Sequence, residues 1–250
     1  MERHPLCRKI YLELAPPTEE DARGDRERIL DGLTGEYTAA VMPLQVMRRL
    51  YPLCRKAGWK VTLLMGFHDD VWEILDIEAG DTTDQLYGLA VDYGSTTLVM
   101  QVVDLHTGET LTQQTAFNPQ IPYGEEILSR IFYTKDQPEH LEELQQKTAE
   151  GFNALIRMCE EATGIPKDQY GAMVIGGNTT MIHLLLGLSP WPVFETPFAP
   201  VAQHPGFVRA KELGLEISAN LGPPRDKDVS SADPEIRKAG IKFLCDIMHQ

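Results

Sequence analysis

The stretch Tyr87–Asp104, with the sequence YGLAVDYGSTTLVMQVVD, decides the fold that the sequence predicts. Two apolar runs flank the short polar segment DYGSTT, which is the pattern of two strands joined by a tight turn. A second turn over 106–109 leads into a third strand that ends at Ala116, so we expect an antiparallel meander of three strands. P-loops and dinucleotide-binding loops run from a strand into a helix instead, so a phosphate loop here would be of a different kind.

The turn after the first of these strands has the composition of an anion-binding site. Gly94 lets the backbone bend closely around an anion, and successive N–H groups with the hydroxyls of Ser95, Thr96 and Thr97 can donate to phosphate oxygens. Asp92, at the strand end, could hold Mg²⁺ through water or orient an attacking water. The same residue types also close hairpins that bind nothing, but the apolar strands on both sides favour a phosphate site.

A second candidate is the segment GGNTT over 176–180, where a buried strand is predicted to run into a short helix. Asn178 or Thr179 can cap this helix, and the N–H groups at its start would suit an anion or a polar loop of a partner. Gly177, Asn178 and Thr179 are therefore candidate phosphate-binding residues. The alternative, which the sequence leaves open, is that the glycines serve only close packing and that Thr179 is only a cap.

The strongest helical pattern in the chain spans 138–163, with Gly164 and Pro166 as stop signals. In the short helix after the second candidate segment, we interpret His183 as a packed side chain rather than a base, because its neighbours are apolar. The aromatic and proline-rich segment 191–198 predicts an edge strand or a wrapping arm.

The first 84 residues predict a separate small α+β unit. Its expected elements are a strand over 6–14, a helix from an N-cap at Thr18 to Leu33, a helix over 43–56, and strands over 60–66 and 71–78. His68, Asp69 and Asp70 could suit a divalent ion, but we interpret them as a solvated turn between the last two strands.

Composition narrows the classes of protein. The 250 residues carry a formal net charge of -14, which repels phosphate backbones, so we expect no nucleic-acid partner and favour a basic protein surface. No apolar run approaches the ~20 residues of a membrane helix and no signal-peptide pattern is present, so we expect a cytoplasmic protein without membrane contact. The four cysteines, Cys7, Cys54, Cys159 and Cys245, form no C-x-x-C pair and indicate reduced structural thiols.

Several segments, taken together, resemble the reductive activators of corrinoid proteins. Similarity to the actin-like ATPase domain of that family lies in 87–103, NPQI (118–121), YGEEILSRI (123–131), GNTTM (177–181), LLGL (185–188) and PFAPV (197–201). Similarity to its middle domain lies in RKIYLEL (8–14), GWKVT (58–62) and GDTTD (80–84). The resemblance covers about residues 6–220.

The resemblance implies an α/β fold in which a small α+β middle domain (1–84) precedes the first lobe of an actin/hexokinase-like, ribonuclease H-like ATPase fold (85–220), followed by a divergent tail (221–250). It implies Mg-ATP as the ligand of the turn at 92–97. Members of the family use ATP to drive electron transfer from a [2Fe–2S] cluster to an oxidised corrinoid, so it also implies a corrinoid (cobalamin) protein of a methyltransferase system as the partner.

Two parts of the family pattern have no counterpart in the sequence, namely the ferredoxin-like domain with its four cysteine ligands and the second ATPase lobe. We therefore expect a fragment or a shortened member that binds nucleotide weakly at best, with one amphipathic helix over 236–248 in its tail. Two hypotheses follow: an ATPase-type activation protein that lacks its own cluster, or a non-catalytic module that dimerises or docks a corrinoid protein. A sugar or acetate kinase relative would share the phosphate turn but not the segments 118–120 and 177–181.

Overall fold

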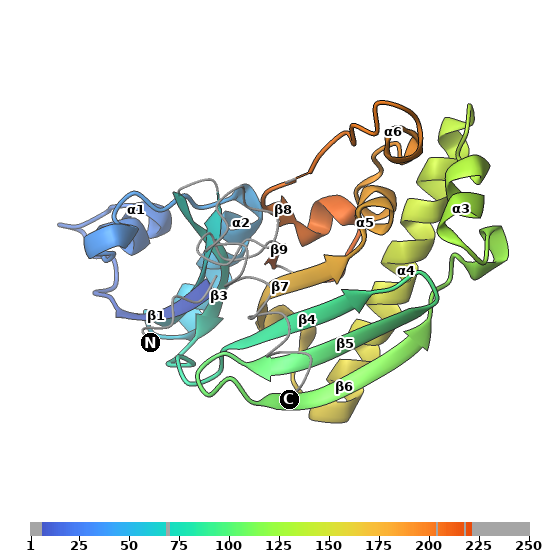
Figure 1. The fold of residues 1–250 in the computed structure, drawn as a ribbon. Coiled ribbons are helices and arrows are strands. Elements are labelled where there is room, and N and C mark those ends of the chain that lie inside the picture. Colours follow the sequence, from blue (N-terminus) through green and yellow to red (C-terminus); the bar gives the residue numbers. More distant parts are fainter. Residues whose placement is uncertain (1–6, 69–70, 204, 218, 222–250) are drawn as a thin grey trace.

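The computed structural model describes residues 7–68, 71–203, 205–217 and 219–221, which fold into two α/β units joined by the segment 80–86 (Figure 1). The predicted α/β class and the order of a small unit followed by a larger one are therefore observed. The predicted tail helix, Leu6, Cys245 and the Asp69–Asp70 part of the predicted turn lie outside the described residues.

The first unit is an antiparallel sheet with its helices on one face. Its elements are β1 (Cys7–Glu13), α1 (Asp25–Asp31), a 3-10 turn (Gly35–Tyr37), α2 (Leu44–Lys56), β2 (Lys60–His68) and β3 (Val71–Ala79). The described strands pair in the order β1-β2-β3. Val46, Leu50 and Cys54 recur at helical spacing on α2, so they form one apolar stripe, and this stripe packs on the sheet residues Leu63 and Ile74.

The predicted start of the first helix was wrong. The hydroxyl of Thr18 accepts a hydrogen bond from the Asp21 N–H over 3.1 Å in a local turn, and α1 begins only at Asp25, after Gly24. The reason is the buried Arg28, whose guanidinium donates to the Asp21 carboxylate over 2.7 Å. The segment before the helix therefore wraps around this side chain as a loop instead of forming a first helical turn.

The second unit is a mixed sheet backed by a long helix. Its strands are β4 (Tyr87–Tyr93), β5 (Thr97–Asp104), β6 (Thr110–Phe117), β7 (Tyr170–Gly177), β8 (Val208–Arg209) and β9 (Asn220–Leu221). Its helices are α3 (Ile127–Tyr133), α4 (Pro138–Thr163), α5 (Thr179–Leu186), α6 (Trp191–Phe194) and the 3-10 turns Ile121–Tyr123, Lys167–Gln169 and Ala210–Leu213. The described strands lie in the order β6-β5-β4-β7-β9-β8.

The predicted meander is confirmed, since β4, β5 and β6 pair in antiparallel fashion, while β7 lies parallel to β4 on its other side. Alternate residues of β4, namely Leu89, Val91 and Tyr93, pack with Phe152 and Ile156 of α4 in the apolar core. No helix in the described part of the chain combines the length and the apolar composition that crossing a bilayer requires.

The prediction of an edge strand or arm over 191–198 was wrong. Residues 191–194 form one helical turn, α6, with Pro192 near its start, where a missing N–H costs nothing. The Trp191 indole N–H donates to Glu195 over 2.7 Å, and the rings of Trp191 and Phe194 both contact Phe132 of α3. Packing of these aromatic rings on a neighbouring helix therefore decides the local structure.

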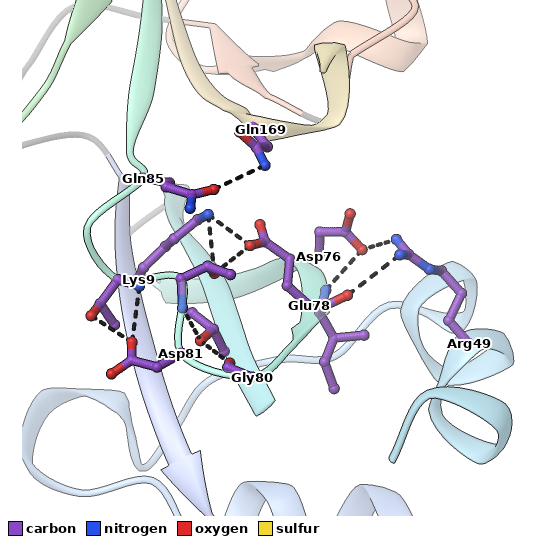
Figure 2. A network of polar contacts seen from close by, with 12 residues as sticks. Lys9, Arg49, Asp76, Glu78, Gly80, Asp81, Gln85 and Gln169 are labelled. Carbon is purple, nitrogen blue, oxygen red and sulfur yellow. Dashed lines mark hydrogen bonds and ion pairs between the residues drawn. The ribbon is translucent and has the colours of Figure 1, made fainter. Parts of the chain in front are cut away.

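The two units meet along the face of the first sheet that the helices leave open. Cys7, Leu64 and Leu75 of the first unit pack with Leu86 and Ala172 in one apolar cluster. Figure 2 shows polar contacts of the connecting segment: Lys9 donates to Thr82 over 3.3 Å, and Gln169 donates to Gln85 over 3.3 Å. The connecting segment is therefore held to both units.

Candidate functional site

The two segments singled out from the sequence lie at one edge of the larger sheet. Because β4 and β7 are parallel neighbours, their carboxyl ends meet, and the register places Asp92 beside Gly176 and Tyr93 beside Gly177. Figure 1 shows both strands pointing toward the side of the unit where α5 begins. The β4–β5 turn and the β7–α5 junction, far apart in the chain, thus form one candidate site.

Three successive peptide carbonyls of the β4–β5 turn accept hydrogen bonds from Asn118 and Arg130. The Gly94 carbonyl accepts from Asn118 Nδ2 over 2.8 Å, the Ser95 carbonyl from Arg130 Nη2 over 2.5 Å, and the Thr96 carbonyl from the Asn118 N–H over 2.8 Å. These peptides are trans, so each N–H points away from its carbonyl. The N–H groups of Ser95 and Thr96 therefore face away from these donors, and neither has an acceptor among the described residues.

Side chains of the turn add further donors. The hydroxyls of Ser95, Thr96 and Thr97 make no hydrogen bond with any described residue, and Thr96 is exposed. Gly94 is needed by the turn itself, because its N–H donates to the Thr97 carbonyl over 3.0 Å and a Cβ would lie only 2.6 Å from that oxygen. Adjacent free N–H groups and hydroxyls are the chemistry that binds phosphate oxygens.

Asp92 is half-buried at the end of β4, and its carboxylate makes no hydrogen bond or ion pair with the described residues. A carboxylate that is not already neutralised can bind Mg²⁺ through its water shell or accept a proton from a positioned water. Together with the free donors of the turn, this oxygen ligand fits the magnesium complex of a nucleotide.

The β7–α5 junction settles which residue caps the helix. Asn178 Oδ1 accepts from the Met181 N–H over 3.0 Å, so Asn178 is the N-cap and Thr179 is the first helical residue. A Cβ on Gly177 would lie 3.1 Å from the Tyr93 carbonyl and 3.3 Å from Ile182 Cδ1, so this glycine does permit close packing. A phosphate contact at Gly177, Asn178 or Thr179 stays a prediction.

His183 is confirmed as a packed side chain. It is buried, its Nδ1 lies 2.7 Å from the Thr179 carbonyl, and its Nε2 accepts from the Ala202 N–H over 3.4 Å. Since a carbonyl can only accept, Nδ1 carries the proton, and the neutral ring ties α5 to the segment that follows α6.

The sequence predicted no role for Asn118, Gln120 and Arg130, which form the hydrogen-bond network that supports the turn. Asn118 Oδ1 accepts from the Gln120 N–H over 2.8 Å, and Gln120 accepts from Arg130 Nη1 over 3.3 Å. Gln120 also donates to Thr148 of α4 over 2.8 Å, and Thr148 shares a 2.7 Å hydrogen bond with the Tyr93 hydroxyl. The signal in the sequence was the polar segment NPQ directly after an alternating strand.

The described cysteines do not fit an iron–sulfur cluster. Cys7, Cys54 and Cys159 are free and buried, and each belongs to a different apolar cluster. Burial raises the pKa of the Cys7 thiol to about 12 and the pKa values of Cys54 and Cys159 to about 11, so all three are protonated near neutral pH. The described residues also contain no group of three or more histidine, cysteine, aspartate or glutamate side chains that could hold a metal ion.

The fold and the site thus define a small α+β unit followed by an α/β lobe. The hairpin turn of this lobe presents free hydrogen-bond donors of the kind that bind anions. Family models identify the chain further: the RACo linker region matches residues 1–84, and the RACo middle region matches residues 87–222. The chain belongs to the RACo family, as the resemblance predicted, and the two matches meet at the segment that joins the two units.

Two similar proteins agree with this assignment. The corrinoid activation enzyme RamQ of Eubacterium limosum is 34% identical over 143 residues, which are 57% of this chain and 24% of that protein. The solved structure of a reductive activator for corrinoid, iron-sulfur protein matches with a TM-score of 0.74 and 29% identity, over 88% of this chain and 36% of that one. The match confirms the predicted fold class, and the chain spans well under half the length of either relative.

Proposed function

We propose that this chain binds Mg-ATP at the β4–β5 turn and takes part in the ATP-dependent reductive activation of a corrinoid protein. The observation that carries the proposal is the pair of free N–H groups of Ser95 and Thr96, whose peptides are held by hydrogen bonds to the Gly94 and Ser95 carbonyls. The names of the relatives, a corrinoid activation enzyme and a reductive activator, supply the biological setting.

Each residue of the turn has a separate task in this proposal. The N–H groups of Ser95 and Thr96 and the nearby hydroxyls hold phosphate oxygens, while Asp92 holds Mg²⁺ through water and orients the water that attacks the terminal phosphate. When bound, the magnesium ion neutralises phosphate charge. Gly177, Asn178 and Thr179, beside the turn across the β4–β7 pair, complete the phosphate contacts at the start of α5.

The proposed partner is a corrinoid protein of a methyltransferase system, with the chain acting in the cytoplasm, where free thiols such as Cys7 stay reduced. The net charge of -14 favours a partner that presents a basic surface. The described residues offer no ligand set for a [2Fe–2S] cluster, so the proposal assigns them no electron-transfer step.

A second candidate function is that of a docking or dimerisation module without catalysis. Large apolar side chains are exposed on and after α3 and α6, in the half of the chain that carries the turn. They are Leu128, Phe132, Phe194, Phe198 and Val201. Exposed apolar patches of this kind mark protein contacts, so protein docking without nucleotide binding remains the competing hypothesis for the same chain.

Calorimetric titration with Mg-ATP separates the two functions. We expect the full chain to bind with micromolar affinity and Asp92→Ala to bind about 10- to 100-fold more weakly, because a charge-assisted contact is lost. Asp84→Ala is the matched control, since Asp84 is exposed and has no partner among the described residues, and its affinity should equal that of the wild type. Absence of binding by the wild type would exclude the nucleotide function and leave the docking module.

A further inference from the structure

Arg130 is a buried positive charge that no carboxylate neutralises among the described residues. The residue has no exposed surface. Its guanidinium donates to the carbonyls of Ser95 and Gly124, to the Gln120 side-chain oxygen and to Met181 Sδ, all of which are neutral. Burial lowers the pKa of this guanidinium, yet an arginine stays charged in proteins.

A single buried charge is costly, because its hydration is lost and hydrogen bonds to neutral groups replace only part of it. The chain shows the usual solution at Arg28, which is equally buried and lies 2.7 Å from the Asp21 carboxylate. Arg130 lacks such a partner in the described part of the chain. Its location therefore needs an explanation beyond packing.

The location is directly beneath the candidate anion site. Arg130 Nη2 donates to the Ser95 carbonyl over 2.5 Å, and the N–H on the other end of that same peptide is the free N–H of Thr96. A hydrogen bond to the carbonyl of a peptide polarises it and strengthens the donor at its opposite end. The positive charge of Arg130 and the free N–H of Thr96 therefore both favour an anion bound at Thr96, on the side of the turn away from the core.

We propose that Arg130 is the positioning residue of the phosphate site, acting through the Ser95–Thr96 peptide, and that the negative charge of the bound phosphates is its counter-ion. The inference rests on the proposed nucleotide site and deepens it. Arg130 does not touch the ligand, so its contribution is to hold the turn and to supply a fixed charge. If Arg130 only held the turn, its hydrogen bonds would matter and its charge would not. Variants that keep or remove the charge distinguish these two roles.

Two substitutions separate charge from hydrogen bonding. Arg130→Lys keeps the charge with fewer donors, whereas Arg130→Gln keeps neutral donors without the charge. In Mg-ATP titrations of the full chain we expect Arg130→Gln to bind about 10- to 100-fold more weakly and Arg130→Lys to recover most of that loss. Arg157→Gln is the control, because Arg157 is a half-exposed arginine of α4 that pairs with Glu216.

A second pair of variants tests the same charge without touching the arginine. Met181 lies 3.4 Å from Arg130 Nη1 and is fully buried, so Met181→Glu would give the guanidinium an internal counter-ion. We expect Met181→Glu to weaken Mg-ATP binding about 10-fold relative to Met181→Gln, which has the same shape without the charge. A thermal melt followed by circular dichroism shows whether Arg130→Gln folds. If it does not, the Met181 pair alone tests the role of the charge.

The outcomes distinguish the inference from the proposed function. Equal weakening by Arg130→Lys and Arg130→Gln, or equal affinities of Met181→Glu and Met181→Gln, would overturn the charge role while nucleotide binding by the wild type stands. Absence of Mg-ATP binding by the wild type would overturn both. Rescue by lysine together with loss in Met181→Glu is the result that the proposal requires.

Discussion

Glycines at the candidate site are restricted by contacts with the protein's own backbone. Gly94 was predicted to let the backbone bend around an anion, and a Cβ there would already collide with the Thr97 carbonyl. A Cβ on Gly177 would make a tight contact of 3.1 Å with the Tyr93 carbonyl, whereas a Cβ on Gly176 would meet nothing nearer than 3.8 Å. Glycine in a loop is therefore weak evidence for a ligand until the free donors around it are known.

The buried thiol of Cys7 makes the stability of the protein depend on pH. Burial raises the pKa of Cys7 to about 12, so the folded state keeps its proton at pH values where the unfolded chain, with a thiol pKa of about 8.5, has released it. The stabilising effect is complete below about pH 8.5 and is lost as the pH rises toward 12. Alkaline conditions should therefore weaken the fold.

We expect the free energy of unfolding to fall by about 2.5 kcal/mol more in the wild type than in Cys7→Ala between about pH 8 and about pH 10.5. Urea denaturation at each pH measures this difference. The tyrosines and lysines titrate in both proteins, so their contributions cancel when the two pH profiles are subtracted. Parallel pH profiles for the two proteins would contradict the assigned shift.

Elements were predicted well where one pattern dominates and poorly where a distant side chain intervenes. The helix over 138–163 was confirmed residue for residue as α4, because its apolar stripe and its left-handed Gly164 end define it locally. The helix predicted from Thr18 failed because the buried Arg28 binds the preceding loop. The segment 191–198 failed because ring contacts with α3 decide its shape.

The N-cap of α5 is testable at the scale of one element. Asn178→Ala removes the acceptor of the Met181 N–H, so we expect a loss of about 1 kcal/mol in the free energy of unfolding. Thr179→Ala should cost less, because Thr179 is inside the helix and its side chain caps nothing. Urea denaturation of both variants measures the difference, and a larger effect of Thr179→Ala would show that the cap is misassigned.

At the scale of the whole molecule, the contact between the two units is close enough to couple them. Gly171 of β7 faces β1 and β2, and a Cβ there would lie 2.8 Å from Cys7 Sγ and 2.9 Å from Leu64 Cδ1. Arg209 of β8 reaches across to the buried Glu73 of β3 over 3.1 Å. The segment 80–86 contacts both units at this junction, through Thr82 to Lys9 and through Gln85 to Gln169 (Figure 2).

Gly171→Ala should therefore weaken the contact between the units. We expect a loss of about 1 to 3 kcal/mol from overpacking and a first unit that unfolds before the second. Two of the three tryptophans, Trp59 and Trp72, lie in the first unit. In urea denaturation of the variant, the transition seen by tryptophan fluorescence should therefore separate from that seen by circular dichroism, and the two should coincide in the wild type. Gly176→Ala is the control on the same strand, and identical behaviour of the two variants would contradict a coupled junction.

The sequence by itself determined the two units, the β4–β5–β6 meander, the helices α2 and α4 and the candidate residues Asp92 to Thr97, because period, turn residues and caps are local signals. Only the tertiary structure placed the β7–α5 junction beside that turn, since parallel pairing of β4 with β7 joins segments far apart in the chain. It alone brought Asn118 and Arg130 beneath the turn. A buried arginine acts through the three-dimensional location of its charge, which no spacing in the sequence encodes.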